Sequence, residues 1–274
     1  MSSIVPTVVQ PPATIRNIRA SIIVTVYNEG DLIIECLDRI FEAVGIPVEV
    51  LVVFDFPDDT TRGPTEAYAA REPRVKPTLN TFGPGPAQAI RFGFATAVAP
   101  VVVVTMADGS DDPAQIDPLV RLVERGVVVA AASRYMRGGQ QVGGPWLKRR
   151  LSRYAGLSLH AVARVGTHDA TNSFKAYSKP FVESVGIVSA TGFEVGLELV
   201  AKARRYRQPV AELPTIWLDR SEGISNFKVA KWLPKYLKWY AFAFGPRLYF
   251  PGPSSSVSAR QPPPPPPLTN NTKE

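Results

Sequence analysis

The sequence predicts an α/β fold with a mainly parallel sheet that helices cover on both faces. Short apolar runs alternate along the chain with amphipathic segments whose apolar residues recur at helical spacing. The runs are apolar at almost every position, which is typical of strands that are buried on both faces and joined by helical crossovers. The chain carries no internal repeat.

The first predicted unit is the strand SIIVTV at 21–26 and the helix after it. Gly30 and Asp31 follow the strand and suit a turn and a helix start. The apolar residues that come next recur at steps of three and four, which predicts a helix; they are Leu37, Ile40, Phe41 and Val44.

The same alternation continues through two further units. The run VEVLVVF predicts a strand at 48–54, followed by a helix at 64–71 and a short strand near 75–79. A helix at 87–98 then leads into the strand VVVVTM at 101–106. Strands separated by single helices favour parallel pairing, because each helix carries the chain back to the same edge of the sheet.

The second half begins with a helix at 114–126 and a strand at 127–133. Two later segments, 145–163 and 228–250, have apolar and aromatic residues at helical spacing and Lys or Arg on another face. Pro234 lies inside the second and is expected to kink or restart that helix. Such helices suit a membrane interface, or they pack on the sheet with solvated basic side chains; both interpretations stay open.

We expect one folded body at 20–250, between a disordered N-terminal tail at 1–19 and a disordered, proline-rich tail at 251–274. The tails are rich in proline or serine and cannot bury enough apolar area to offset their ordering entropy. The single cysteine, Cys36, excludes an internal disulfide framework. No apolar run approaches the roughly 20 residues of a membrane-spanning helix, and the chain does not open with a signal-peptide pattern. We therefore expect a cytoplasmic protein, with any membrane contact peripheral and on the inner face.

Charge is distributed unevenly along the chain, whose net charge is +7. The first 120 residues hold 8 Lys/Arg and 15 Asp/Glu, whereas the rest hold 23 and 9. The acidic half suits a divalent cation, and the basic half suits phosphates, nucleic acid or an anionic membrane surface. Nucleic acid is not expected, because the aromatic residues lie on predicted helices rather than on a strand platform and no nucleic-acid motif is present.

Polar clusters follow three of the predicted strands. They are Tyr27-Asn28-Glu29, then Asp55 with Asp58 and Asp59, then Asp108 with Ser110, Asp111 and Asp112. Each loop alone is an ordinary cap or turn, and Asp112-Pro113 has the pattern of a helix N-cap. Because ligands gather beyond the carboxyl ends of parallel strands, three such loops in series predict one binding crevice.

Eight segments in order resemble the motifs of family 2 glycosyltransferases of the dolichyl-phosphate mannose synthase type. They are SIIVTVYNEGD, VVFDFPDDTT, NTFGPGPAQAIRFGF, VVVVTMADGSDDP, ASRYMRGG, DATNSFKAY, GFEVGLELVAKA and WLDRSEGISNFK. The resemblance spans about residues 20–240. It implies a GT-A fold, which is a Rossmann-like sandwich, with a nucleotide-sugar half at about 20–120 and an acceptor half at about 121–250.

The resemblance also implies roles for the first half of the crevice. The loop Tyr27-Asn28-Glu29 and Asp55 would hold the base and ribose of a nucleoside diphosphate sugar. Asp108 would be the carboxylate of a DXD motif that binds Mg²⁺ or Mn²⁺ at the diphosphate of the donor. A hard cation with oxygen ligands suits this position, because it neutralises the charge that develops on the departing diphosphate.

One position departs from the family pattern. Where synthases of this type usually carry Asp-Ala-Asp, this chain has Met106-Ala107-Asp108. A thioether is a poor ligand for a hard cation, so one carboxylate ligand is missing. We expect Ser110 to supply an oxygen instead, with Asp111 contributing through water.

Three residues of the second half match positions that serve the acceptor in the family. Arg134 matches an arginine that faces the reacting phosphates, and Arg220 and Ser225 match a loop that closes over the site. Arginine binds phosphate through paired donors and stays charged at any relevant pH. A phosphate acceptor needs no general base, because its oxygen is already anionic.

The expected function is therefore inverting, metal-dependent transfer of a hexose from a nucleoside diphosphate sugar to a polyprenyl phosphate. Two alternatives stay open. A family 2 enzyme with a saccharide or other hydroxyl acceptor would need a base, for which Glu194 and Asp169 are the candidates, although the spacing of Glu194, Glu198 and Lys202 favours a structural role. A non-catalytic nucleotide-sugar binding or scaffold protein would be consistent with Met106 and the proline-rich tail.

Overall fold

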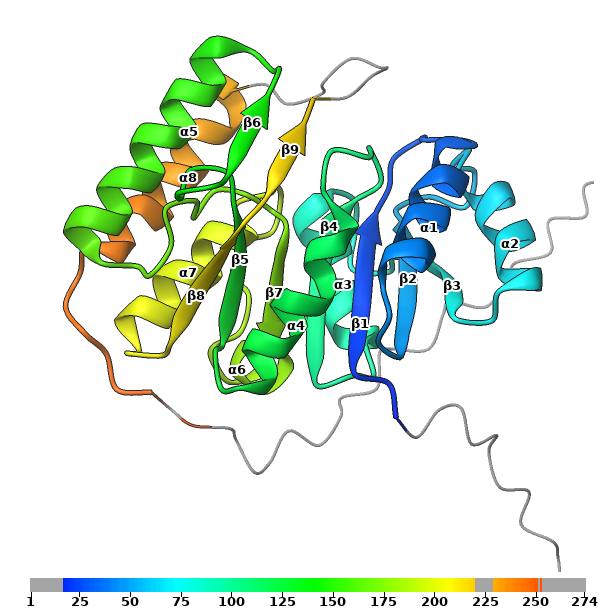
Figure 1. The fold of residues 1–274 in the computed structure, drawn as a ribbon, viewed down its shortest axis with the longest axis horizontal. Coiled ribbons are helices and arrows are strands. Elements are labelled where there is room, and N and C mark those ends of the chain that lie inside the picture. Colours follow the sequence, from blue (N-terminus) through cyan, green and yellow to red (C-terminus); the bar gives the residue numbers. More distant parts are fainter. Residues whose placement is uncertain (1–16, 220–228, 251, 253–274) are drawn as a thin grey trace, which may run out of the picture.

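The structure is a computed structural model, and it describes residues 17–219, 229–250 and 252 of the 274-residue chain. The two predicted tails lie outside these ranges except for residues 17–19 and 252. Within the described ranges, a seven-stranded sheet is sandwiched between two layers of helices (Figure 1). This arrangement confirms the predicted α/β class.

The sheet has the strand order β3-β2-β1-β4-β7-β5-β8. Its members are β1 (Ala20–Thr25), β2 (Val48–Phe54), β3 (Val75–Leu79), β4 (Val101–Met106), β5 (Val129–Ser133), β7 (Lys175–Ser178) and β8 (Val210–Pro214). Strand β7 runs antiparallel to β4 and β5, and the other neighbours pair in parallel. Strands β1, β2, β4, β5 and β8 therefore all point their carboxyl ends to one edge of the sheet.

Both faces of the sheet are apolar because alternate residues of the strands point to opposite sides. Ile22 and Val24 of β1 pack in one cluster, with α1 (Leu32–Ala43), α2 (Arg62–Arg71) and α4 (Ile116–Glu124). Ile23 packs in the other. The second face is covered by α3 (Pro86–Thr96), α6 (Lys179–Val185), α7 (Val195–Arg205), α8 (Val229–Ala243) and the π-helical turn η3 (Leu159–Ala163).

Helix α3 packs unusually close to the sheet. A Cβ atom added to Gly93 of α3 would lie 2.7 Å from Cδ1 of Ile23, so only glycine fits there. The close approach fixes the position of the amino end of α3. That end starts at Gly85, next to the carboxyl edge of the sheet.

Smaller elements lie beyond the carboxyl edge. Strands β6 (Gln140–Val142) and β9 (Ile216–Leu218) pair in parallel as a separate two-stranded sheet. Asp112 caps the short 3₁₀ helix η2 (Pro113–Gln115) by accepting from the backbone N–H of Ala114, which confirms the predicted N-cap. Helix α5 (Trp146–Ser158) leads into η3.

The predicted elements differ from the observed ones mainly at their ends. The strand expected at 127–133 begins at Val129. Helix α8 runs through Pro234 without a break, from Val229 to Ala243. The prediction that the helix restarts at this proline was therefore wrong. Trp239 and Ala243 are buried between α8 and its neighbours, and this packing holds the helix together where the proline removes a backbone donor.

Candidate functional site

The loop that follows β1 is held by the loop that follows β2. Asn28 has a left-handed backbone (φ 53°), and its N–H donates to the carboxylate of Asp59, at 3.1 Å from Oδ2. The N–H of Thr60 donates back to Oδ1 of Asn28, and the N–H of Glu29 donates to Oγ1 of Thr61. These bonds leave the ring of Tyr27 exposed at the rim.

Asp55 ties three segments together at the same edge. One of its carboxylate oxygens accepts from Nδ2 of Asn80 at 2.8 Å, and the other accepts from the N–H of Gly85 at 2.7 Å. Gly85 has φ 114°, which favours glycine, and a Cβ there would lie 3.1 Å from the carbonyl oxygen of Thr191. The start of α3 therefore meets the loop before α7 beside Asp55.

The acidic loop after β4 is internally bonded. Asp108 accepts from both the N–H and the hydroxyl of Ser110 through Oδ1, at 3.1 and 2.5 Å. Asp111 is buried, and its Oδ2 accepts from the hydroxyl of Thr105. Arg39 of α1 donates to the carbonyl oxygen of Gly109 and so fixes the loop from outside. Sequence reasoning missed Arg39, which nothing in its local pattern distinguishes from an exposed helical arginine.

The two carboxylates of this loop repel each other. Burial and the charge of Asp108 raise the pKa of Asp111 to about 7, although the hydroxyl of Thr105 and the charge of Arg134 act in the opposite direction. A divalent cation would relieve this repulsion, and oxygen atoms are the donors that Mg²⁺ and Mn²⁺ prefer. The residues of the loop therefore fit the predicted cation.

Met106 is the last residue of β4 and is partly buried. Its sulfur lies 3.7 Å from the hydroxyl of Thr25 on the neighbouring strand. Met106 thus stands at the start of the acidic loop, and its backbone N–H donates to Oδ2 of Asp111 at 3.3 Å. The carboxylate of Asp111, which comes later in the chain, therefore lies next to the backbone of Met106.

Arg134 follows β5 and is paired with a buried carboxylate. Its Nε lies 2.7 Å from Oδ2 of Asp169, and its Nη2 lies 2.9 Å from Oδ1. The side chain of Asp169 is fully buried, and Arg134 holds the pKa of that carboxyl below its usual range in spite of the burial. The rings of Tyr135 and Trp217 lie 4.9 and 5.9 Å from the guanidinium carbon.

This pairing changes the assignment of Asp169. Both of its carboxylate oxygens accept hydrogen bonds from Arg134, and the side chain has no exposed surface. This bonding and burial do not fit the candidate role of Asp169 as a base for a substrate hydroxyl. Arg134 and the acidic loop both contact β9, because the ring of Trp217 lies 5.9 Å from the guanidinium carbon of Arg134 and the N–H of Leu218 donates to the carbonyl oxygen of Ser110.

The segment that carries the other predicted acceptor residues begins next to the acidic loop. The N–H of Leu218 in β9 donates to the carbonyl oxygen of Ser110 at 3.1 Å, and Asp219 accepts from the N–H of Gly144. Arg220 and Ser225 lie outside the described residues. The bond of Leu218 places the end of β9 beside the acidic loop.

Glu194 precedes α7, and only one of its oxygens is bonded. Its Oε1 receives long contacts from Thr191 and Gly192, whereas Oε2 is buried and has no hydrogen-bond partner among the described residues. Glu198 and Lys202, one and two turns further on, form a buried ion pair of 2.5 Å. The structural role that the spacing favours for Glu194 is not supported by this pair, which joins only Glu198 and Lys202.

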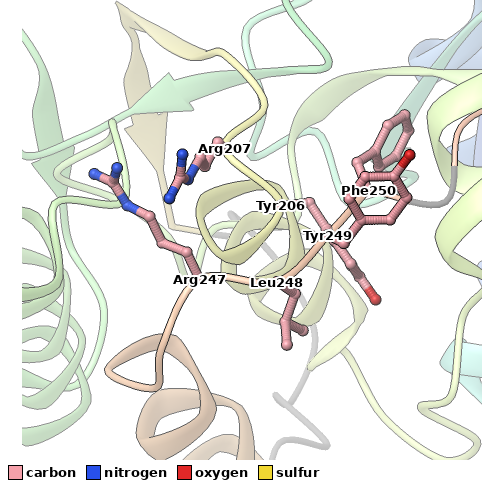
Figure 2. A pocket seen from close by; sticks show the side chains of 6 residues that line it. All are labelled: Tyr206, Arg207, Arg247, Leu248, Tyr249 and Phe250. Carbon is pink, nitrogen blue, oxygen red and sulfur yellow. The ribbon is translucent and has the colours of Figure 1, made fainter.

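Two cavities of the described chain lie away from these loops. One, of about 380 Å³, is lined by Tyr206, Arg207 and the segment 247–250, and Figure 2 shows the Arg207 and Arg247 side chains there. Arg207 precedes β8, which runs parallel to β5. This arginine cavity therefore lies at the amino edge of the sheet, opposite the crevice.

The strand order, with the loops after β1, β2 and β4 at one edge of the sheet, places the fold among the GT-A glycosyltransferases. Residues 21–186 match the family model described as Glycosyl transferase family 2, and the chain belongs to this family. It is 29% identical over 240 residues to a polyprenol monophosphomannose synthase of Mycolicibacterium smegmatis, covering 81% of this chain and 90% of that protein.

A second relative and two solved structures agree with this assignment. A dolichol-phosphate mannosyltransferase of Pyrococcus furiosus is 29% identical over 225 residues, which cover 80% of this chain and 62% of that longer protein. A glucosyl-3-phosphoglycerate synthase of Mycobacterium tuberculosis, crystallised with Mn²⁺ and UDP, superposes with a TM-score of 0.60 at 18% identity, covering 84% and 81%. A mannosyltransferase of Pyrobaculum calidifontis, in complex with GDP-Man and Mn²⁺, gives 0.56 at 21% identity, covering 84% and 65%.

Proposed function

We propose that this family 2 glycosyltransferase moves a mannosyl group from GDP-mannose to a polyprenyl phosphate, with inversion at the anomeric carbon. The names of the two curated relatives support the sugar and the acceptor class. The observation that carries the proposal in the structure is the placement of Arg134, which lies 5.9 Å from the ring of Trp217 on β9, while the next residue of β9, Leu218, bonds the acidic loop at Ser110. An arginine suits an acceptor that brings its own negative charge.

The donor side of the crevice is assigned to the loops after β1, β2 and β4. We assign the base and ribose to Tyr27, Asn28, Glu29 and Asp55, of which Tyr27 is exposed and the other three lie on bonded loops. Asp108 and Ser110 would hold Mg²⁺ or Mn²⁺, which when bound neutralises charge on the diphosphate leaving group. Burial and the charge of Asp108 raise the pKa of Asp111, and a bound cation would favour the charged form of that carboxyl.

In the reaction, an oxygen of the acceptor phosphate attacks the anomeric carbon from the side opposite the diphosphate. A new carbon–oxygen bond forms as the bond from the anomeric carbon to the diphosphate breaks, and GDP leaves with that electron pair. No proton has to be removed from the acceptor, since its oxygen is already an anion. Arg134, which Asp169 holds rigid, would orient the acceptor phosphate. Arg220 and Ser225 would complete the acceptor side of the site.

Two helices offer a surface for the lipid part of the acceptor. Trp146, Leu147, Leu151 and Tyr154 of α5 are exposed large side chains, with Tyr154 at 66%. Helix α5 is tied to α8 by a hydrogen bond between Ser158 and Tyr240, and α8 exposes Leu233 and Leu237. Arginines lie between the apolar residues of α5, which suits peripheral contact with an anionic membrane. Within the described chain, no helix is long and apolar enough to cross a bilayer.

A second candidate is transfer to a hydroxyl group. The observation that favours it is Glu194, whose buried Oε2 has no hydrogen-bond partner in the part of the chain that is described. A buried carboxylate near the crevice is the group that a hydroxyl acceptor would need as a base. In this reading the acceptor would be a saccharide and Arg134 would have only a structural role.

One assay separates the candidates. The full chain is incubated with labelled GDP-mannose or UDP-glucose and a short-chain polyprenyl phosphate, with Mn²⁺ or with a chelator, and the organic phase is counted. We expect lipid-linked mannose only with GDP-mannose and only with the cation. Transfer to soluble sugars alone, lost in Glu194→Gln, would favour the second candidate, and donor binding without any turnover would point to a non-catalytic protein. Product that is unaffected by chelator would exclude the metal role of Asp108.

A further inference from the structure

Two histidines and a glutamate gather away from the crevice, on three different elements. His160 lies on η3, His168 lies in the segment between η3 and β7, and Glu212 lies on β8. One ligand atom from each lies within 4.8 Å of the other two. The chain has only these two histidines, and both are in this cluster. We call it the His-His-Glu cluster.

The glutamate of the cluster is held in place. Its Oε2 accepts from the N–H of His168 at 2.8 Å and from the hydroxyl of Thr167 at 3.0 Å. Its Oε1 lies 2.5 Å from Nδ1 of His168. The carboxylate therefore presents one oxygen to the imidazole in a fixed direction.

The second histidine is not explained by that pair. The rings of His160 and His168 stack with centroids 3.6 Å apart and an interplanar angle of 21°. Nδ1 of His160 is buried and has no hydrogen-bond partner among the described residues. The hydrogen bond between His168 and Glu212 explains how these two side chains are held, but it gives Nδ1 of His160 no partner. Since an unpaired buried acceptor is costly, a missing partner is the simplest account.

We propose that the His-His-Glu cluster binds a divalent transition-metal ion of the zinc type, separate from the cation at the donor diphosphate. Two imidazoles and one carboxylate are a donor set that Zn²⁺ takes, and imidazole favours such ions over Mg²⁺. Because His168 is partly exposed, water completes the coordination.

To bind an ion, the side chains of the His-His-Glu cluster must move from the positions that the structure gives them. Bonds of about 2.0–2.2 Å around a tetrahedral ion separate the ligand atoms by roughly 3.3 Å. Oε1 of Glu212 and Nδ1 of His168 are hydrogen-bonded, and the ion takes the place of the proton in this bond. The two imidazole rings are stacked at an interplanar angle of 21°, so they must turn out of the stack for their nitrogen lone pairs to converge on the ion, and the exposed side of His168 leaves room for this movement.

The cluster is distinct from the acidic loop. Glu212 lies on β8, which is three strands from β4 in the sheet, or roughly 14 Å at 4.7–4.9 Å per strand. The residue after His168 is Asp169, which holds Arg134. An ion here fixes the segment 160–169 against β8 and so stiffens the support of that arginine. Its role is structural, and its presence does not depend on the proposed reaction.

The test measures metal binding by the untagged full chain. Protein stripped with a chelator and dialysed is titrated with Zn²⁺, and with Co²⁺ while the visible absorption of nitrogen-ligated cobalt is followed. The variants are His160→Ala and Glu212→Gln. Asp108→Asn removes the donor-site carboxylate, and Glu183→Gln removes an exposed carboxylate of α6 as a matched control.

We expect one tight Zn²⁺ in the wild type, in Asp108→Asn and in Glu183→Gln, with a raised melting temperature in each. His160→Ala and Glu212→Gln should bind at least about tenfold more weakly and lose the cobalt spectrum. Undiminished affinity in His160→Ala overturns the proposal, as does loss of the signal in Asp108→Asn or the absence of tight binding by the wild type. If Glu212→Gln does not fold, His160→Ala still decides, because its Nδ1 makes no bond in the described structure.

Discussion

Arg134 and Asp169 form a two-point ion pair between the end of β5 and the segment before β7. The pair is buried, with side-chain exposures of 11% and 0%. Nε of Arg134 lies 2.7 Å from Oδ2 of Asp169, and Nη2 lies 2.9 Å from Oδ1. Asp169 therefore fixes the plane of the Arg134 guanidinium.

Replacing Asp169 by Asn should lower the free energy of unfolding by about 3 kcal/mol, since it leaves the buried guanidinium of Arg134 without its counter-charge. Urea unfolding followed by circular dichroism measures this change. Glu183→Gln is the control, because its ion pair with Lys179 is exposed and long, at 3.7 Å, and should contribute no more than about 0.5 kcal/mol. Equal losses in the two variants would mean that the buried pair adds no stability.

Asp108 and Asp112 lie four residues apart in one loop but should differ sharply in function. Asp108→Asn removes the proposed cation ligand and should reduce turnover by about 100-fold or more. Asp112→Asn affects only the cap of η2, where Asn serves almost as well, and should change stability by less than about 1 kcal/mol. Initial rates of lipid-linked sugar formation test both. Comparable rates in the two variants would remove Asp108 from the cation site.

Much of the fold could be predicted because its signals are local. Strands such as VEVLVVF are buried on both faces, so their composition alone marks them, and the observed β2 covers the predicted residues 48–54. The N-cap at Asp112 was also predictable, because a cap depends on three or four neighbouring residues. The polar loops were found at the ends of their strands for the same reason.

The features that could not be predicted are contacts between residues that lie far apart in the chain. The pairing of Arg134 with Asp169 joins residues 35 positions apart, and Arg39 reaches Gly109 across 70. The antiparallel insertion of β7 between β4 and β5 likewise has no local signal. Pro234 was expected to interrupt a helix, but tertiary packing through Trp239 overrides that local tendency.

Restoring a carboxylate at position 106 should strengthen cation binding. Met106 borders the acidic loop, and Met106→Asp would add a hard oxygen ligand beside Asp108. We expect the Mn²⁺ concentration for half-maximal activity to fall by about tenfold. Met106→Leu keeps the shape and adds no ligand, so its Mn²⁺ requirement should equal that of the wild type. An unchanged requirement in Met106→Asp would place this side chain outside the reach of the cation.

The exposed apolar residues of α5 should mediate membrane contact. The double variant Trp146→Ser and Leu147→Ser removes two large exposed side chains without touching the core, because their exposures are 63% and 53%. Cosedimentation with vesicles that contain anionic lipid should fall several-fold, since binding scales with buried apolar area. Val98→Ser removes an equally exposed residue next to α3 and should bind as the wild type does. Undiminished sedimentation of the double variant would show that α5 does not reach the membrane.

Glu49 should make stability depend on pH in the acidic range. Its side chain is almost fully buried in β2 and accepts from Ser21 at 2.6 Å, from Lys76 at 2.7 Å and from the N–H of Val98 at 2.9 Å. Burial alone would raise the pKa of this carboxyl, but the three donors outweigh it and hold the pKa below its ordinary value.

The direction in which stability changes with pH follows from the number of protons that the folded and unfolded chains bind. Between the lowered pKa and the ordinary glutamate value of about 4.3, the unfolded chain binds more protons than the folded one. The contribution of Glu49 is therefore complete above this range and is lost as the pH falls through the folded-state pKa. Glu49→Gln should be about 2 kcal/mol less stable at pH 7 and should show a shallower loss of stability below about pH 4.5. Urea unfolding at a series of pH values, with the exposed Glu42→Gln as control, measures both effects; a slope equal to that of the wild type would mean that other carboxylates cause the acid sensitivity.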